Sequence, residues 1–461
     1  MAYALLAILL LGLLLIATER INRMNKAAVA MFVGVICWLL YIIQGGTFVA
    51  HEHAAEYASF LSSRLESPGI LKEFIASHIF VKYVAKSAEV VLFLIATTTI
   101  VEVLNNNGCF DFLAPWLKTR QPITLLWTLA LITFILSAHI DNLTIVVLLV
   151  GIFHSYLPTE KLRRIYTVVI LLAANCGGAI TVIGDVTSLK LWTDGLVEPT
   201  PYFVVLILPV LTALVVTLLL LQKFLPSRIS YTFVQMPFRG DDTILRPWQR
   251  ILMLFVGIGG LWFIPTFHKL TQLPPFVGAL CVLGLLWIVN ELCNRTLMRS
   301  DRLTGKRIPI ALQYLNTQNI LFFIGLVLMF GAVSETGLMH TLFVRTTENV
   351  RNIYLINLAM GAFSAIFGNV PALICGVSIF NHPDFLQNSD VFASGGLFWP
   401  MLSYATALGS CLLSTASIAG IMMMRMESVT FGWYLRHIAP KVLAGFFAGF
   451  IVLWFLTTYA L

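Results

Sequence analysis

Apolar segments long enough to cross a lipid bilayer recur along the whole of this 461-residue chain. A transmembrane helix needs about 20 predominantly apolar residues. Such segments lie near 2–18, 27–44, 87–104, 165–193, 201–221, 251–266, 274–291, 317–337, 397–424 and 432–458. Because 59% of the residues are hydrophobic and only 11% are charged, a soluble fold of this size is excluded. The sequence therefore predicts an all-α polytopic membrane protein with about ten transmembrane helices in a lipid bilayer.

The basic residues lie in short loops between the apolar segments, and they predict the orientation of the chain. The formal net charge is +7, but Arg and Lys do not gather on one face, so we expect no nucleic-acid partner. Arg20, Arg23 and Lys26 follow the first segment and place that loop in the cytoplasm by the positive-inside rule. We expect a bacterial inner membrane with both chain termini on the periplasmic side.

Two further apolar stretches, near 122–157 and 352–380, do not fit as single crossings. Basic residues flank the first stretch on both sides: Lys118, Arg120, Lys161, Arg163 and Arg164. A single crossing would leave one basic loop outside, whereas a re-entrant hairpin keeps both loops inside. The second stretch precedes a loop, 382–396, without Lys or Arg, which suits the outer face. We therefore expect two re-entrant hairpins that enter the membrane from opposite sides.

The order of these segments predicts an internal repeat. Three spans, a hairpin and two spans occupy residues 1–222, and the same order follows in 248–461 with the opposite orientation. A polar stretch, 223–247, is expected to join the two repeats as a cytoplasmic linker. Inverted repeats with discontinuous helices at mid-membrane are the architecture of secondary transporters.

The first stretch is interrupted by a polar tip, Ser137 to Thr144, which contains Asp141. A carboxylate in hydrocarbon costs about 2.5–3.5 kcal/mol or more unless it faces a cavity, pairs or holds an ion. The next span is also interrupted, with Asp185 at the break and with Gly177, Gly178 and Gly184 expected to permit unwinding.

These two breaks together offer carboxylate, amide, hydroxyl and carbonyl oxygens. Such a set suits Na⁺ or Li⁺ and a competing proton, with Na⁺ held by Asp141 and Asp185. The predicted ion- and proton-binding residues are Asp141, Asn142, Thr144, Asn175, Thr181, Asp185 and Thr187. The alternative is that the two aspartates are structural and cap the half-helices. Glu102, Glu89 and His139 are further candidates for a proton relay.

The second half has matching breaks at 364–372 and 406–420 but contains no carboxylate there. Gly368 stands where the first half has Asp141, so the two sites cannot be equivalent. The candidate ligands of this second-half site are Asn369, Ser410, Ser414 and Thr415.

Three other features have simpler explanations. Glu335 is expected to be solvated at the end of its span. His51 and His53 lie in a polar loop, and their spacing is not that of a zinc-binding helix. The small residues of Ala444–Gly449 are expected to pack helices within one subunit rather than to form a dimer interface.

The two breaks resemble those of the NhaD-type sodium/proton antiporters of the ion transporter superfamily. In that family the hairpin tip reads Asp-Asn-Leu-Thr, as Asp141–Thr144 does here, and the broken span resembles Ala174–Thr187. The likeness extends, in order, to Thr99–Glu102, Ser364–Pro371 and Gly409–Gly420, and so covers most of the chain.

The resemblance implies an elevator-like transporter, commonly dimeric, that exchanges Na⁺ for H⁺ and needs no cofactor. Three departures from the family pattern are visible. Gly368 replaces the acid of the second hairpin, and Ile145 replaces a usual Thr. The residues Ile-Thr-Val at 180–182 stand where the family has an aromatic residue, Ser and Pro. The loss of the second acid bears on the stoichiometry and on the substrate.

Two rival functions remain open at this stage. A Na⁺-coupled carrier of an organic anion or oxyanion would call for a basic residue at mid-membrane, and neither break has one. An intramembrane aspartyl protease would also use two membrane aspartates. That enzyme family has Tyr before one aspartate and Gly-x-Gly before the other, whereas Ile140 precedes Asp141 and Val182 stands in place of the first Gly.

Overall fold

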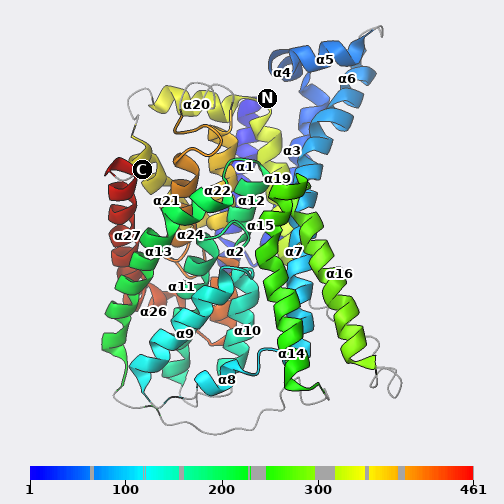
Figure 1. The fold of residues 1–461 in the computed structure, drawn as a ribbon. Coiled ribbons are helices and arrows are strands. Elements are labelled where there is room, and N and C mark those ends of the chain that lie inside the picture. Colours follow the sequence, from blue (N-terminus) through cyan, green and yellow to red (C-terminus); the bar gives the residue numbers. More distant parts are fainter. Residues whose placement is uncertain are drawn as a thin grey trace. The chain divides into compact units, whose positions relative to one another are not determined.

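The computed structural model describes residues 1–62, 67–117, 119, 121–154, 160–226, 229, 245–295, 317–347, 352–382 and 390–459. In this part of the chain every regular element is helical, which confirms the all-α prediction. The helices fall into two compact units, whose elements are labelled in Figure 1. The first unit comprises 1–88 and 316–406, and the second comprises 89–315 and 407–461.

The first unit is built around the packing of α3 against α19. Its helices are α1 (Ala2–Ala17), α2 (Glu19–Asn22), α3 (Lys26–Gln44), α4 (Gly46–Glu52), α5 (Ala54–Leu61), α6 (Pro68–Phe74), the π-helix η1 (Ile75–Phe80), the start of α7 (Val81–Asn106), α19 (Thr317–Ser334), α20 (Leu338–Thr347), α21 (Ile353–Phe367), α22 (Asn369–Phe380) and most of α24 (Phe398–Gly409). A Cβ added to Gly34 would lie 2.9 Å from the Gly325 carbonyl oxygen. Small residues therefore bring these two backbones into contact.

The segment between α3 and α7 is helical, although the sequence shows no apolar span between 44 and 87 and predicts a polar loop around His51 and His53. The helices α4 and α5 lie here, and α6, η1 and α7 form one continuous helical stretch, 68–106. Local helix signals explain the difference, because Ser67 caps α6 by accepting a hydrogen bond from the Ile70 amide, and Pro68 occupies the first turn.

The second unit contains the first hairpin, the first interrupted span and the last span of the chain. Its helices are the rest of α7, α8 (Leu113–Trp116), α9 (Pro122–Ser137), α10 (Asn142–His154), α11 (Glu160–Ala179), α12 (Val186–Thr193), α13 (Pro199–Leu221), the 3₁₀ turn η2 (Gln222–Phe224), α14 (Pro247–Leu254), the π-helix η3 (Phe255–Gly259), α15 (Gly260–Thr271), α16 (Pro275–Cys293), α25 (Ile418–Met426), α26 (Phe431–His437) and α27 (Ala439–Tyr459). In Figure 1, α13 and α27 run side by side. A Cβ on Gly445 would lie 2.5 Å from the Ala213 carbonyl oxygen. The intrasubunit packing predicted for Ala444–Gly449 is therefore confirmed at Gly445.

Two pairs of short antiparallel helices occupy the predicted hairpin positions. They are α9 with α10 and α21 with α22, and in each pair the two helices contact one another. The arms α9 and α10, with 16 and 13 residues, reach about 24 and 20 Å, less than the ~30 Å hydrocarbon core. Helix α1 also has 16 residues, so length alone does not separate a hairpin arm from a span, and the re-entrant course of the two hairpins stays a prediction.

Both interrupted spans are present. The helix α11 ends at Ala179, and α12 begins at Val186; α24 ends at Gly409, and α25 begins at Ile418. The glycines of the first break act through close packing rather than through backbone freedom, because none of the three has a positive φ. A Cβ on Gly177 would lie 2.2 Å from the Phe134 carbonyl oxygen, and one on Gly184 would lie 2.8 Å from Gly178 Cα.

Seven helices of the described chain are long and apolar enough to cross a membrane. With α1 and the two interrupted spans they reproduce the ten predicted segments. The order of spans, hairpin and interrupted span also recurs in both halves. Their opposite orientation in the membrane stays a prediction, and most of the predicted linker, 223–247, lies outside the described residues, as do Lys118 and Arg120.

Candidate functional site

Asp141 lies in the short non-helical link between α9 and α10, at the predicted hairpin tip. Its Oδ2 accepts hydrogen bonds from the backbone amide of Thr144, at 3.3 Å, and from the Thr144 hydroxyl, at 3.5 Å. Its Oδ1 is buried and has no hydrogen-bond partner. A buried carboxylate oxygen without a donor is costly unless a proton or a cation compensates it.

Asp185 occupies the break of the first interrupted span and caps α12. Its Oδ1 accepts from the Val186 amide at 2.8 Å, and its Oδ2 accepts from the Thr187 hydroxyl at 2.8 Å. Ser188 completes a capping box with the backbone of Asp185. Both aspartates therefore cap half-helices, Asp185 at α12 and Asp141, through the Thr144 amide, at α10, but a carboxylate that caps a helix retains its charge and further lone pairs.

Hydrogen bonds tie the hairpin tip to the interrupted span. The Asn142 amide donates to Asn175 Oδ1 at 3.1 Å, and the Ser137 hydroxyl donates to the Ala174 carbonyl at 2.8 Å. The Thr181 hydroxyl donates to the Ala138 carbonyl. These contacts bring the two breaks together, and the carboxylates of Asp141 and Asp185 are near enough to repel one another. The role of Ser137 was missed because a buried serine in an apolar run resembles ordinary helix packing.

The second-half residues are divided between the two units. Asn369 is buried at the start of α22 in the first unit. Ser410, Ser414 and Thr415 lie in the break of the second unit, where the Ser410 hydroxyl donates to the Ala407 carbonyl. The hydroxyl of Ser414 is buried and has no hydrogen-bond partner.

An equivalent serine contact appears at both hairpins. Ser364 lies four positions before Gly368, just as Ser137 lies four positions before Asp141. The Ser364 hydroxyl donates to the Thr406 carbonyl at 2.6 Å, within the second interrupted span. The same hairpin-to-span hydrogen bond thus recurs at matching sequence positions in the two halves.

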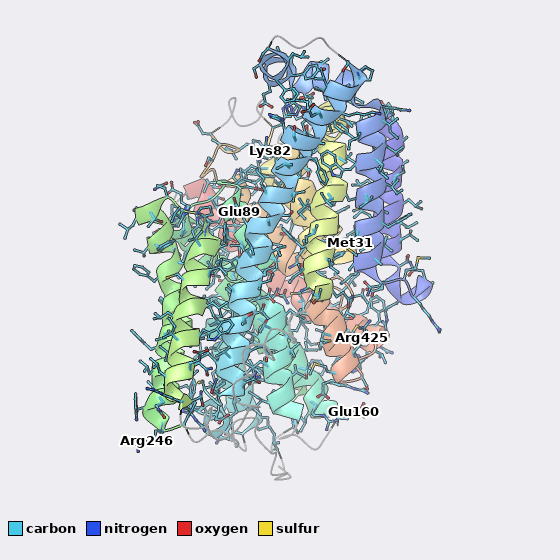
Figure 2. The ribbon with its side chains drawn as sticks, turned by 90° about the vertical axis from the view of Figure 1, so that its right-hand side faces the viewer. Met31, Lys82, Glu89, Glu160, Arg246 and Arg425 are labelled. Carbon is cyan, nitrogen blue, oxygen red and sulfur yellow. The ribbon has the colours of Figure 1, made fainter. Side chains whose placement is uncertain are left out.

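The three candidate relay residues have different surroundings. Glu89 and Glu102 are half-buried on α7 and lie about 20 Å apart along it. Figure 2 shows Glu89 on this helix and, in the second unit, Glu160 and Arg246 at the end where α11 and α14 begin. His139 lies at the hairpin tip, where Nδ1 donates to the Ile135 carbonyl and the ring stacks on Trp262.

Glu335 is not solvated, contrary to the prediction. Its Oε1 accepts from the Tyr83 hydroxyl at 2.7 Å, and its Oε2 lies 2.6 Å from His53 Nε2. His53 lies between α4 and α5, outside the membrane-spanning segments, and the Glu335 carboxylate raises its pKa above the ordinary value. The sequence could not show this contact because 282 positions separate the two residues.

A buried lysine close to the first break was also missed. Lys190 lies on α12 and pairs with Asp194 one turn later. Among the described residues no group of three or more His, Cys, Asp or Glu side chains could hold a metal ion. The candidate site is instead a set of carboxylate, amide and hydroxyl oxygens, which matches the ligands preferred by small hard cations.

Comparison with known proteins identifies the family. A family model described as a citrate transporter, CitMHS, matches residues 13–391. "Sodium/proton antiporter 1" and "Sodium/proton antiporter 2" of Arabidopsis thaliana are 33% and 32% identical to this chain. The alignments cover 79% and 78% of this chain, and 61% and 84% of the respective relatives. "Na(+)/H(+) antiporter NhaD" of Alkalimonas amylolytica is 26% identical over 80% of this chain and 77% of its own length. The chain is therefore a multi-pass membrane transporter rather than an enzyme, and it belongs to the citrate transporter family as a divergent NhaD-type member.

Proposed function

We propose that this chain exchanges Na⁺ or Li⁺ for H⁺ across its membrane. The observation that carries this proposal is the unpartnered, buried Oδ1 of Asp141 beside a second carboxylate, Asp185. Two neighbouring carboxylates in a low-dielectric site repel one another, so a cation or a proton is needed to compensate their charge. The names of the relatives support exchange of these two ions.

The mechanism we propose is competition for one site. Asp141 and Asp185 bind either the alkali cation or protons, and only the cation-loaded or protonated site crosses the membrane barrier. Asn142, Asn175 and Thr181 hold the hairpin tip on the interrupted span, and Thr144 and Thr187 orient the two carboxylates.

The second half would contribute neutral oxygens. The buried hydroxyl of Ser414 has no partner and lies in the same unit as the two aspartates. Helix α25, which follows the second break, contacts α10 and α11, and these contacts support a position of the second break close to the first. We include Ser410, Ser414, Thr415 and Asn369 as further ligands, and Glu89, Glu102 and His139 as relay residues.

The proposed architecture involves both halves of the chain. We infer that 1–222 and 248–461 are inverted repeats around the linker 223–247, and the matching serine contacts of the two hairpins support this. An elevator-like movement of the hairpins, a homodimer, and both termini on the outer side of the membrane complete the proposed architecture.

A Na⁺-coupled carrier of an organic anion is the second candidate. The description of the matching family as a citrate transporter favours it. Such a substrate needs positive charge at the site, but Lys190 is paired with Asp194. Backbone amides at hairpin tips would have to bind the anion instead.

Uptake of labelled Na⁺ into proteoliposomes tests the two candidates. With an outward proton gradient and no organic anion present, the antiporter should accumulate Na⁺ while the lumen loses protons. Uptake that requires citrate or another carboxylate, and that ignores the proton gradient, would reject antiport in favour of the anion carrier.

A further inference from the structure

The tip of the first hairpin is held from outside by an aromatic side chain that the proposed mechanism does not use. The ring of His139 lies parallel to the indole of Trp262, with an interplanar angle of 5° and 4.5 Å between ring centroids. His139 Nδ1 faces the Ile135 carbonyl at 3.0 Å, and because a carbonyl only accepts, this nitrogen carries the proton. The imidazole is therefore fixed by a hydrogen bond in its plane and by stacking on its face.

The helix that presents Trp262 is itself fixed on two sides. A Cβ on Gly257 would lie 2.9 Å from Leu104 Cδ1 of α7, and one on Gly260 would lie 2.6 Å from Val282 Cγ1 of α16. Gly257 lies in the middle of the π-helix η3, and Gly260 is the first residue of α15. A π-helical turn adds one residue and rotates every later side chain about the axis, and such turns are frequent at functional sites. The π-helix thus sets the direction in which Trp262 points.

Burial shows that Trp262 is not a core residue. Its side chain is 62% exposed, and its neighbour Phe263 is 54% exposed. Both are large, exposed apolar residues of α15, but the stacking contact with the hairpin tip is made by Trp262. The difference between these two neighbours is therefore the contact with His139.

We propose that Trp262 is a positioning residue for the cation site, because its indole holds the hairpin tip in the place where Asp141 binds the ion. This inference rests on the proposed Na⁺/H⁺ exchange. His139 and Asp141 belong to the same short link between α9 and α10, so a tip that loses its stacking partner samples more positions. The carboxylate is then less often correctly placed for binding.

The effect is expected mainly in the apparent affinity for the cation. An aromatic stacking contact of this kind corresponds to about threefold to tenfold in an equilibrium constant. Trp262→Ala should raise the KM for Na⁺ by that factor and change kcat less, whereas Trp262→Phe should restore most of the affinity. Phe263→Ala is the matched control and should leave KM unchanged.

A double-mutant cycle on the Na⁺ Kd of the purified protein tests the inference, because binding of the cation does not require the proton-relay role proposed for His139. If the stack is the cause, Trp262→Ala should have little further effect in a His139→Ala background. Additive effects of the two substitutions, or equal effects of Trp262→Ala and Phe263→Ala, would overturn the positioning role. A native protein that moves no protons in response to Na⁺ would instead reject the proposed function. Cross-linking of His139→Cys with Trp262→Cys by a short thiol reagent, with Phe263→Cys as the control, then shows separately whether the contact exists.

Discussion

Replacing Asp185 by asparagine removes a charge but leaves the cap of α12 in place. Asparagine caps helices about as well as aspartate, and its side-chain oxygen accepts the Val186 amide in the same way. The repulsion between Asp185 and Asp141 also disappears. We therefore expect Asp185→Asn to be at least as stable as the native protein without cation, and to lose cation-dependent proton movement.

Asp185→Ala provides the comparison, because it removes the cap and the charge together. Loss of the cap costs about 0.5–2 kcal/mol, and a buried Thr187 hydroxyl without its acceptor costs about 1–3 kcal/mol more. The matched control is Ser417→Ala, which removes the cap of α25, where Ser417 Oγ accepts the Gly420 amide at 3.0 Å. Ser417→Ala should lower the free energy of unfolding only by the contribution of one helix cap.

The measurements are thermal unfolding in detergent and Na⁺-driven proton movement in proteoliposomes. In Asp185→Asn the unfolding temperature should be preserved while Na⁺-driven proton movement is absent. Normal exchange by a stable Asp185→Asn protein would show that Asp185 is only a helix cap, and the two-carboxylate site would be refuted.

Three further predictions concern stability. Because Glu335 raises the pKa of His53, their pair stabilises the fold fully below the ordinary histidine pKa and loses this effect as the pH rises through the raised value. The difference in unfolding temperature between the native protein and His53→Gln should therefore shrink from about pH 6 to about pH 9, and a growing difference would contradict the assignment. Gly177→Ala should lower the free energy of unfolding by about 1–3 kcal/mol, because the added Cβ meets a backbone carbonyl of α9. Gly151→Ala is the control and should not lower it, because the space around Gly151 is open. Equal unfolding temperatures of the two variants would disprove the close packing at Gly177. Gly368→Asp should cost about 1–3 kcal/mol, since its φ of 104° and ψ of 164° suit glycine alone, and an unchanged unfolding temperature would show that this conformation is not required.

The spans, hairpins and breaks were predictable because each depends on local sequence. Apolar length, flanking charge and polar interruptions are properties of neighbouring residues, and α9, α10 and the break before Asp185 lie where these patterns place them. Asp141 and Asp185 could be chosen as candidates for the same reason, since the cost of a carboxylate in hydrocarbon does not depend on its partners.

What the sequence did not show depends on contacts between distant segments. The helices of 45–86 are too polar to be recognised as spans, so the segment resembled a loop. The stack of Trp262 on His139 joins residues 123 positions apart (262 − 139), and the π-helix that precedes Trp262 has no composition signature. In the sequence Gly368 shows only the loss of an acid, whereas its positive φ gives glycine a separate reason to occupy this position.

The dependence of the Na⁺ KM on pH tests the central claim most directly. If Na⁺ and protons compete for Asp141 and Asp185, the KM measured by labelled Na⁺ uptake should rise as the pH falls, by about tenfold per pH unit for each competing proton, while the maximal rate stays constant. Asp141→Asn should take up no Na⁺ at any pH. A KM that does not change with pH, or full uptake by Asp141→Asn, would contradict competition at this site.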